Sequence, residues 1–221
     1  MDHLVLGHGL REHGPGILLC YTGHGLLSWK VGHRLDPYIR KGAEWAFRKP
    51  INPNFLSFSG LVLSAIAGVL LSLGYWFTAA WIILAGGLFD LLDGAMARNR
   101  GEVTPFGGFF DSVIDRYSDL FLFLGIMIFY FRAQAMGSMV LTAVAWAGAT
   151  IVPYTRAKAE TVIAKCNVGI MERAERILVL TLATLFNWMI PGLWVIAVLG
   201  HLTAAHRIYY TWRELNRSPA D

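Results

Sequence analysis

The sequence predicts an all-α membrane protein in which six transmembrane helices follow an amphipathic helix on the membrane surface. Hydrophobic residues make up 55% of the 221 positions, and the mean hydropathy is +0.48. A soluble domain needs a larger polar surface than this composition provides. Six apolar segments also have lengths near the ~20 residues that a helix needs to cross a bilayer. Lys and Arg gather at alternate connections between these segments, as expected for a multi-pass chain.

Residues 1–35 are rich in glycine and histidine, and we expect a poorly ordered N-terminal extension there. The histidines His3, His8, His13, His24 and His33 leave a metal role open, although their spacing fits no compact site. Residues 36–49 alternate aromatic with basic residues, which predicts the surface helix. An ordinary helix facing water is the alternative. Residues 36–221 show no internal repeat or low-complexity linker, so we assign them to one membrane domain.

The apolar segments predict the positions of the six spans. We expect them at 55–76, 78–98, 108–132, 136–160, 174–190 and 192–213. Pro50, Pro53 and Gly60 mark the entry to the first span. Pro191 and Gly192 are expected to form the short turn between the last two spans.

Basic residues predict the orientation in the membrane. They precede the first span, follow the second, surround the connection between the fourth and fifth, and end the chain, whereas the opposite connections hold only Arg132. We therefore expect a protein of the cell membrane. Both of its termini and the site formed by its acidic residues should lie on the cytoplasmic side. The net charge of +4 suits an anionic membrane surface better than nucleic acid, because the basic residues flank apolar segments. Cys20 and Cys166 lack metal-ligand spacing, and the first thirty residues lack the pattern of a signal peptide.

Four aspartates interrupt this apolar chain in the pattern D-x2-D-G-x2-A-R-x8-G-x3-D-x3-D. They are Asp90, Asp93, Asp111 and Asp115. Each pair would share one face of a helix. The connection between the pairs is short, so we expect antiparallel neighbouring helices whose four acids meet near the cytoplasmic face. Without basic partners the acids would repel one another unless cations lay between them, and oxygen ligands alone suggest Mg²⁺ or Mn²⁺.

Other residues of the pattern suggest space for a ligand beside the acids. Gly94 and Ala97 would leave room for a ligand or, alternatively, would let helices pack closely. Arg98 is expected to pair with a phosphate or an acid. Gly107 is expected to let the chain turn into the third span. Asp119 continues the acidic face and would pair with Arg116 or a neighbouring helix.

The pattern resembles the signature of the CDP-alcohol phosphotransferase family at every fixed position, and the resemblance extends over residues 50–215. It implies an enzyme that joins an alcohol to the phosphate of a CDP-linked donor and releases CMP. Two metal ions would be held by Asp90, Asp93 and Asp111, together with Asp115. By this resemblance Asp115 is also the general base. The CDP site would comprise Asp93, Gly94, Ala97, Arg98 and Gly107. The resemblance also implies a homodimer.

A second pattern bears on the acceptor alcohol. Tyr154-Thr-Arg156-Ala-Lys158-Ala-Glu160 is followed by Glu172-Arg173-Ala-Glu175-Arg176. This arrangement is similar to that of bacterial phosphatidylinositol-phosphate synthases, with the two basic positions exchanged. It implies that inositol 1-phosphate is the acceptor and CDP-diacylglycerol, or a dialkyl equivalent, the lipid donor. The acceptor phosphate would be held by Arg156, Lys158, Arg176 and Arg207.

Three alternatives stay open at this point. Glycerol 3-phosphate as acceptor would give phosphatidylglycerol phosphate by the same chemistry. Two soluble inositol species would give di-inositol phosphate. The third alternative is a membrane transporter that has a buried cation site and no catalytic activity. The sequence does not identify the lipid tails, the preferred metal, the purpose of the extension or the roles of Asp119, Cys20 and Cys166.

Overall fold

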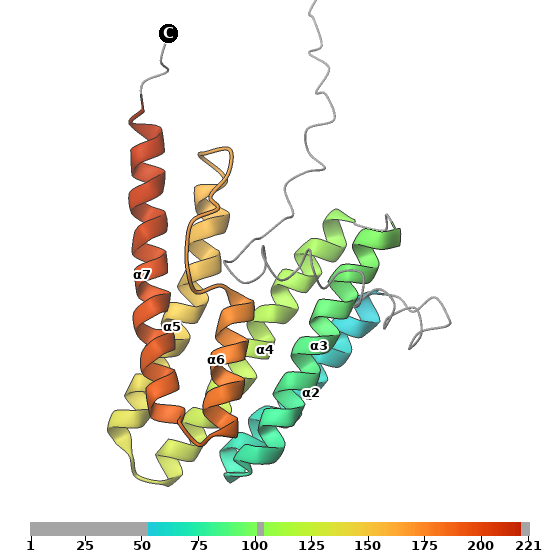
Figure 1. Ribbon diagram of the computed structural model, residues 1–221, viewed down its shortest axis with the longest axis vertical. Helices are drawn as coiled ribbons and strands as arrows, with labels where there is room; N and C mark the ends of the chain where they lie inside the picture. Colours follow the sequence, from blue (N-terminus) through green and yellow to red (C-terminus); the bar gives the residue numbers. More distant parts are fainter. Residues whose placement is uncertain (1–52, 101–103, 218–221) are drawn as a thin grey trace, which may run out of the picture.

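The computed structural model describes the backbone of residues 53–100 and 104–217, and their side chains except at 53, 54, 56 and 91–100. This part of the chain forms six helices and no strand (Figure 1). The helices are α2 (Pro53–Leu73), α3 (Trp76–Arg100), α4 (Pro105–Arg132), α5 (Met136–Ala159), α6 (Arg173–Leu185) and α7 (Met189–Leu215). The predicted all-α class is confirmed for the described residues. The extension at 1–35 and the surface helix at 36–49 lie outside them.

The helices run alternately up and down and pack as a closed ring (Figure 1). Helix α2 packs against α3 and α4, α5 packs against α4 and α7, and α6 packs against α3 and α7. Helices α3 and α4 run in opposite directions, as predicted, but within the described residues they are not among these closely packed pairs. A short connection fixes their antiparallel directions but not their contact, and α2 packs between them.

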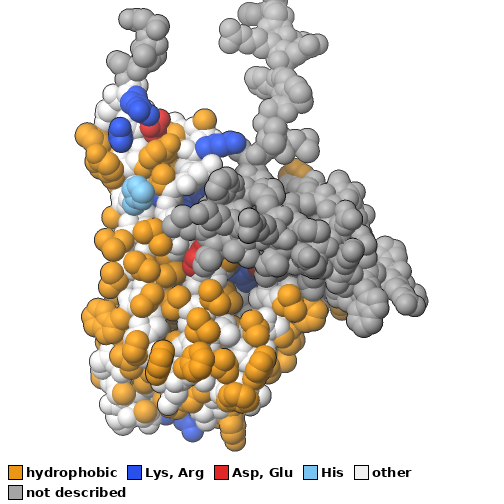
Figure 2. All heavy atoms as spheres, in the orientation of Figure 1, with side chains coloured by type: hydrophobic (Ala, Val, Ile, Leu, Met, Phe, Trp, Pro, Cys, Tyr) orange, Lys and Arg blue, Asp and Glu red, His pale blue; other side chains and the backbone are white. Residues whose placement is uncertain are grey.

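The apolar core lies inside this ring and draws on every helix. Its buried members include Leu71, Ile83, Ile126, Ala145, Leu180 and Ile196. The outer faces also carry large hydrophobic side chains, and Phe58, Trp81 and Trp194 are each more than half exposed. Figure 2 shows hydrophobic side chains over most of the visible face below its upper end, with charged side chains gathered at the upper end and basic ones again at the lowest edge. Soluble monomers rarely expose apolar surface on this scale, whereas a lipid environment favours it.

Length and hydropathy identify α5 and α7 as helices that can cross a membrane. Helix α6 is shorter than predicted, because it has only 13 residues and ends at Leu185. At 1.5 Å per residue it is about 20 Å long, less than the ~30 Å of a hydrocarbon core. The predicted turn at Pro191 and Gly192 was also wrong, since both residues lie in the first turn of α7. Proline is tolerated there because the first helical N–H groups need no partner within the helix.

Three short turns of the same type close the lower end of the ring. Gly74, Gln134 and Asn187 each have a positive φ, of 85°, 56° and 57°. After each, the next backbone N–H bonds back to a carbonyl of the preceding helix, for example Trp188 N to Ala183 O at 2.7 Å. This Schellman geometry satisfies carbonyls that a helix end otherwise leaves without partners. It therefore fixes the pairs α2–α3, α4–α5 and α6–α7.

We expect Gly68→Ala to destabilise the bundle by about 1–3 kcal/mol through overpacking. A Cβ at Gly68 in α2 would meet the carbonyl of Phe121 in α4, and Gly125 approaches Gly68 in the same way. Thermal unfolding of the purified protein in detergent measures the change. Gly137→Ala is the matched control, because a Cβ there meets nothing within 4 Å. Equal unfolding temperatures for the two variants would contradict close packing of α2 on α4.

Candidate metal centre and active site

Three carboxylates from two helices meet inside the ring. Asp90 lies in α3, whereas Asp111 and Asp115 lie one turn apart near the start of α4. One oxygen from each carboxylate lies within 4.8 Å of the others, and all three residues are partly buried. The structure thus brings together three of the four predicted ligands. Asp93 also lies on α3, but its side chain is outside the described ones.

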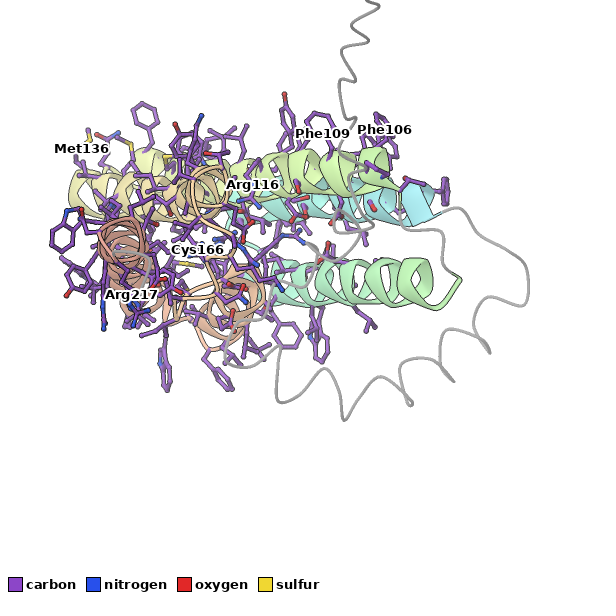
Figure 3. All side chains as sticks on the ribbon, turned by 90° about the horizontal axis from the view of Figure 1, so that it is seen from above. Phe106, Phe109, Arg116, Met136, Cys166 and Arg217 are labelled. Atoms are coloured by element: carbon purple, nitrogen blue, oxygen red, sulfur yellow. The ribbon has the colours of Figure 1, made fainter. Side chains whose placement is uncertain are left out.

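The start of α4 is fixed by a capping residue that places these acids. Thr104 has extended backbone angles, and its hydroxyl accepts a hydrogen bond of 3.0 Å from the N–H of Gly107. Pro105 occupies the first helical position, where its fixed φ suits the helix. Gly107 therefore lies within the first turn, and the expectation that the chain turns at Gly107 was wrong. Figure 3 shows Phe106 and Phe109 pointing out of the bundle and Arg116 lying farther in.

Arg173 is the basic partner that the sequence did not reveal. From the first position of α6 it forms ion pairs with Asp90 and with Asp115 Oδ1, the latter at 2.9 Å. Arg116 Nη2 lies 3.6 Å from the other oxygen of Asp115. The expectation that the acids have no basic partners was therefore wrong. Helix α6 packs beside α3 and directs Arg173 across the interior toward α4.

The acids retain the properties of a divalent cation site despite this arginine. Asp111 Oδ1 is buried and has no hydrogen-bond partner within the described residues. A buried polar atom without a partner costs about 1–3 kcal/mol. A cation coordinated by that oxygen would remove the cost. Carboxylate oxygens alone are the ligands that Mg²⁺ and Mn²⁺ prefer, so the donor set fits either ion.

A second, fully buried ion pair lies one turn below the acids. Arg176 Nη2 is 2.5 Å from Asp119 Oδ2, and the two side chains are 1% and 4% exposed. Arg176 also donates to the carbonyl of Ala149 in α5 at 3.2 Å. Asp119 therefore pairs with a neighbouring helix, which is one of its two expected partners. This pair connects α4, α5 and α6 through the middle of the ring.

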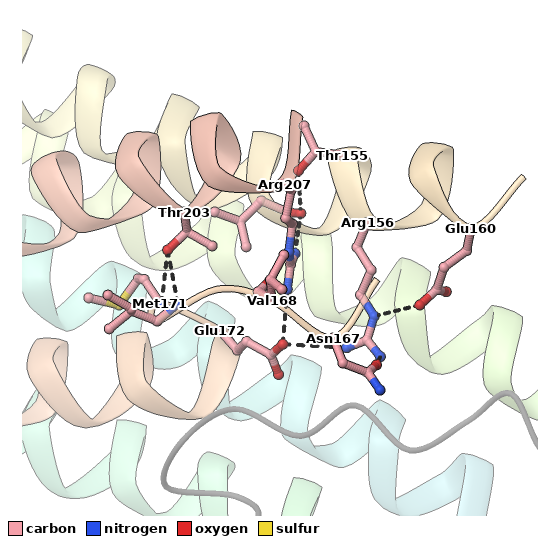
Figure 4. A network of polar contacts seen from close by, with 11 residues as sticks. Thr155, Arg156, Glu160, Asn167, Val168, Met171, Glu172, Thr203 and Arg207 are labelled. Atoms are coloured by element: carbon pink, nitrogen blue, oxygen red, sulfur yellow. Dashed lines mark hydrogen bonds and ion pairs between the residues drawn. The ribbon is translucent and has the colours of Figure 1, made fainter. Parts of the chain in front are cut away.

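A network of two arginines and two glutamates joins the end of α5, the start of α6 and the second half of α7 (Figure 4). Arg207 donates to the carbonyls of Val152 and Val168 and to Glu172 Oε1, at 2.6, 2.8 and 2.9 Å. Arg156 donates to the same Glu172 oxygen at 3.4 Å and to Glu160 at 3.1 Å. Two guanidinium groups therefore converge on one carboxylate oxygen. Such convergence is a typical way to hold an anion.

The connection between α5 and α6 is held in place by α7. The hydroxyl of Thr203 accepts hydrogen bonds from the N–H groups of Ile170 and Met171, at 3.2 and 3.1 Å. Gly169 has a φ of 137°, which favours glycine. Cys166 is buried in this connection and forms no disulfide within the described residues. No motif or spacing marks Thr203 in the sequence, whereas Glu172 and Arg173 belong to the Glu-Arg-x-Glu-Arg run.

The predicted acceptor residues occupy different environments. Arg156 and Arg207 share Glu172, as described above, whereas Lys158 is exposed near the end of α5. Arg176 is paired with Asp119, so the structure does not group it with Arg156 and Arg207. Of the predicted CDP residues, Asp93, Gly94, Ala97 and Arg98 lie in the last part of α3, and their side chains are outside the described ones.

The family model of CDP-alcohol phosphatidyltransferases matches residues 51–206, which include all four motif acids. The chain belongs to this family. The resemblance found in the sequence is thereby confirmed, and the chain is a CDP-alcohol phosphotransferase. Its oxygen-only acid cluster agrees with metal-dependent transfer. Family membership and the two apolar helices α5 and α7 also make it a membrane protein.

Curated relatives of this phosphotransferase include inositol phosphate lipid synthases. Archaetidylinositol phosphate synthase of Methanothermobacter thermautotrophicus is 34% identical, and the match covers 83% of this chain and 95% of the relative. The enzyme of the same name from Pyrococcus horikoshii is 36% identical over 75% of this chain and 86% of its own. Phosphatidylinositol phosphate synthase of Mycobacterium tuberculosis is 32% identical, and the match covers 84% of this chain and 89% of the relative.

Solved structures of the Mycobacterium tuberculosis synthase have a similar fold. The structure with CDP-DAG bound has a TM-score of 0.70 and 26% identity, over 85% of this chain and 96% of that one. The complex with manganese and citrate has a TM-score of 0.67 and 27% identity, over 82% and 90%. The phosphotransferase therefore has the fold of an enzyme that has been crystallised with CDP-DAG and with manganese.

Proposed function

We propose that the chain transfers the phosphatidyl group of CDP-diacylglycerol, or of a dialkyl equivalent, to inositol 1-phosphate and releases CMP. The observation that carries this proposal is the juxtaposition at the start of α6. Glu172 contacts the arginines Arg156 and Arg207, and the adjacent Arg173 contacts the acid cluster. An anion-binding group and a cation-binding group therefore lie next to each other. A phosphorylated acceptor and a nucleotide diphosphate donor require that combination.

We propose Asp90, Asp93, Asp111 and Asp115 as the ligands of two Mg²⁺ or Mn²⁺ ions. When bound, the ions neutralise charge on the diphosphate and on the departing CMP. The nucleotide would lie beside α3, against Asp93, Gly94, Ala97 and Arg98, and reach Gly107 at the start of α4. The close relation to a synthase crystallised with CDP-DAG supports this placement.

Asp115 would accept the proton of the attacking hydroxyl. It lies one turn beyond Asp111 along α4. The inositol oxygen then forms a bond to the lipid-proximal phosphorus, and the bond from that phosphorus to the CMP oxygen breaks. The proton stays on the Asp115 carboxylate, and the lipid inositol phosphate remains in the membrane.

The acceptor phosphate would be held by Arg156, Lys158 and Arg207 at the upper ends of α5 and α7. Arg156 and Arg207 already converge on one carboxylate oxygen, which supports a phosphate oxygen in that position. Arg176 was expected to join them. Because it is buried against Asp119, we now propose that it positions α6 rather than contacts the phosphate directly.

We also propose the finer topology that the charge pattern predicts. All six helices would cross the membrane, and α6 would complete its crossing together with the buried residues Cys166 and Met171 before it. Both termini and the acids would face the cytoplasm. Residues 36–221 would form one domain, with the surface helix at 36–49 and the extension at 1–35. The protein would act as a homodimer among membrane lipids.

Arg156→Gln is expected to raise the KM for inositol 1-phosphate by about tenfold and to leave the KM for the CDP-lipid nearly unchanged, because one charged hydrogen bond contributes roughly 1.5–3 kcal/mol. Steady-state kinetics with each substrate varied in turn measure both constants. Arg217→Gln is the control, since Arg217 pairs with Glu214 at the exposed end of α7. Equal rises in both constants would remove Arg156 from the acceptor site.

A panel of acceptors tests the proposed function. CMP release from CDP-diacylglycerol and from a CDP-dialkylglycerol is measured with inositol 1-phosphate, glycerol 3-phosphate, free inositol and no acceptor. We expect release with inositol 1-phosphate that is abolished by a chelator. Release with glycerol 3-phosphate alone would favour phosphatidylglycerol phosphate synthesis. Cation binding without any CMP release would favour the transporter.

A further inference from the structure

Two adjacent residues at the start of α6 carry opposite charges into two different parts of the site. Glu172 precedes α6 with extended backbone angles, and Arg173 is the first residue of the helix. The Glu172 carboxylate lies against Arg156 and Arg207, whereas the Arg173 guanidinium lies against Asp90 and Asp115. In each place the side chain has the charge of the ligand expected there.

We propose that Glu172 and Arg173 are internal substitutes for the two ligands. Arg173 takes the place of the divalent cation, and Glu172 takes the place of the acceptor phosphate. Each ligand displaces its substitute when it binds. This inference rests on the proposed function, because it takes the acceptor to be an anion.

The contacts of Arg173 support the first half of this proposal. Its guanidinium bridges one carboxylate from α3 and one from α4, as a bound cation would. The Arg173 side chain is only 21% exposed, and Asp115 only 15%, so water screens these charges poorly. Without a counter-charge the acids would repel one another and separate α3 from α4. Arg173 thus balances the charge of these carboxylates, and a divalent cation must compete with it for Asp90 and Asp115.

The contacts of Glu172 support the second half. A single oxygen, Oε1, receives Arg207 Nη2 at 2.9 Å and Arg156 Nη1 at 3.4 Å. Arg207 is only 1% exposed, and a buried guanidinium without an anion would be costly. Glu172 supplies that anion. A phosphate oxygen that replaced the carboxylate would receive the same two donors, so an oxyanion must compete with Glu172.

Because the two residues are consecutive, displacing one changes the position of the other. A cation that releases Arg173 frees the first turn of α6, and this weakens the hold of Glu172 on the arginines. An oxyanion that releases Glu172 has the reverse effect on Arg173. Binding of the two ligands is therefore cooperative, and by linkage each raises the affinity of the other by the same factor.

Mn²⁺ binding tests the role of Arg173 without any catalytic turnover. The free Mn²⁺ signal in electron paramagnetic resonance is titrated with the full chain in detergent. We expect Arg173→Gln to bind Mn²⁺ about tenfold more tightly than the unaltered protein, because no internal cation competes for the carboxylates. A tenfold change in affinity corresponds to ~1.4 kcal/mol. Arg173→Lys keeps the charge and should stay near the unaltered affinity, as should Arg217→Gln. Unchanged or weaker Mn²⁺ binding by Arg173→Gln would overturn the proposal.

The coupling is tested in the unaltered protein, so it does not depend on the folding of a variant. Sulfate serves as the oxyanion, and chloride keeps the ionic strength constant. We expect sulfate to tighten Mn²⁺ binding by about threefold, within the usual range of coupling between sites. Glu172→Gln should remove most of this effect, because its neutral amide does not compete with sulfate. The absence of coupling in the unaltered protein, or its full retention in Glu172→Gln, would overturn the proposal.

These measurements are independent of the acceptor panel. If the panel identifies another phosphorylated acceptor while Arg173→Gln and sulfate behave as expected, only the identity of the acceptor changes. If inositol 1-phosphate is used but Mn²⁺ binding responds to neither change, the proposed function stands and the internal substitutes are excluded.

Discussion

Asp115→Asn is expected to lower the rate of CMP release by about 10²–10⁴-fold, which is the range for loss of a general base. The amide keeps the shape of the side chain but cannot accept the proton of the attacking hydroxyl. Asp115 also pairs with Arg173, so the neutral side chain removes one contact of that arginine. The measurement is the single-turnover rate at saturating Mn²⁺, inositol 1-phosphate and CDP-diacylglycerol.

Two further measurements define the role of Asp115. Mn²⁺ affinity, measured in parallel, separates a proton acceptor from a metal ligand, because only loss of a ligand weakens binding of the ion. Glu214→Gln is the control, since Glu214 lies near the end of α7 and pairs only with Arg217 among the described residues. An Asp115→Asn protein that released CMP at the unaltered rate would exclude Asp115 as the base.

Asp119→Asn and Arg176→Gln are each expected to lower the free energy of unfolding by about 3–5 kcal/mol. Each substitution removes one member of a buried pair and leaves the other charge without its partner. The combined Asp119→Leu and Arg176→Met protein should recover most of the lost stability, because it removes both charges. Thermal unfolding in detergent measures all three variants. The pairing would be contradicted if the combined protein lost as much free energy of unfolding as the two single variants lose together.

The combined variant also tests how Arg176 contributes to function. If Arg176 only positions α6, the stable Asp119→Leu and Arg176→Met protein should retain its KM for inositol 1-phosphate. A large rise in that KM, with normal stability, would restore Arg176 to direct contact with the acceptor phosphate. The kinetics therefore separate the residue's structural role from its originally expected one.

The sequence predicted most helices well because the signals that define them are local. The predicted spans 108–132 and 136–160 correspond to α4 and α5 within a few residues. Apolar length, the proline at the first position of α4 and the basic end of α5 are all local features of the sequence. The end of α6 was predicted too late, because Asn187 adopts a positive φ that nothing in the hydropathy reveals. The Pro191-Gly192 pair gave a stronger turn signal a few positions later.

The candidate site was predictable only in part for a similar reason. Helical spacing placed Asp111 and Asp115 on one face, and the short connection brought Asp90 to the same end. The partner Arg173 comes from a helix far along the chain, and its contact depends on how the ring closes. Neither the hydrophobic periodicity nor the charge pattern predicts which helices pack together to close the ring. The same limit applies to Thr203, whose hydroxyl holds the connection before α6.

The three matching turns at Gly74, Gln134 and Asn187 restrict which end of the helix bundle can change shape to admit a ligand. Each joins its two helices with almost no slack, so the helix ends on that side cannot spread apart. A bulky polyol or nucleotide must therefore be admitted from the opposite side, where side chains such as Thr203 and Arg207, rather than a tight helical turn, hold the connection before α6. Divergence toward new alcohols can alter that connection while the distant hairpins preserve the spacing of the bundle.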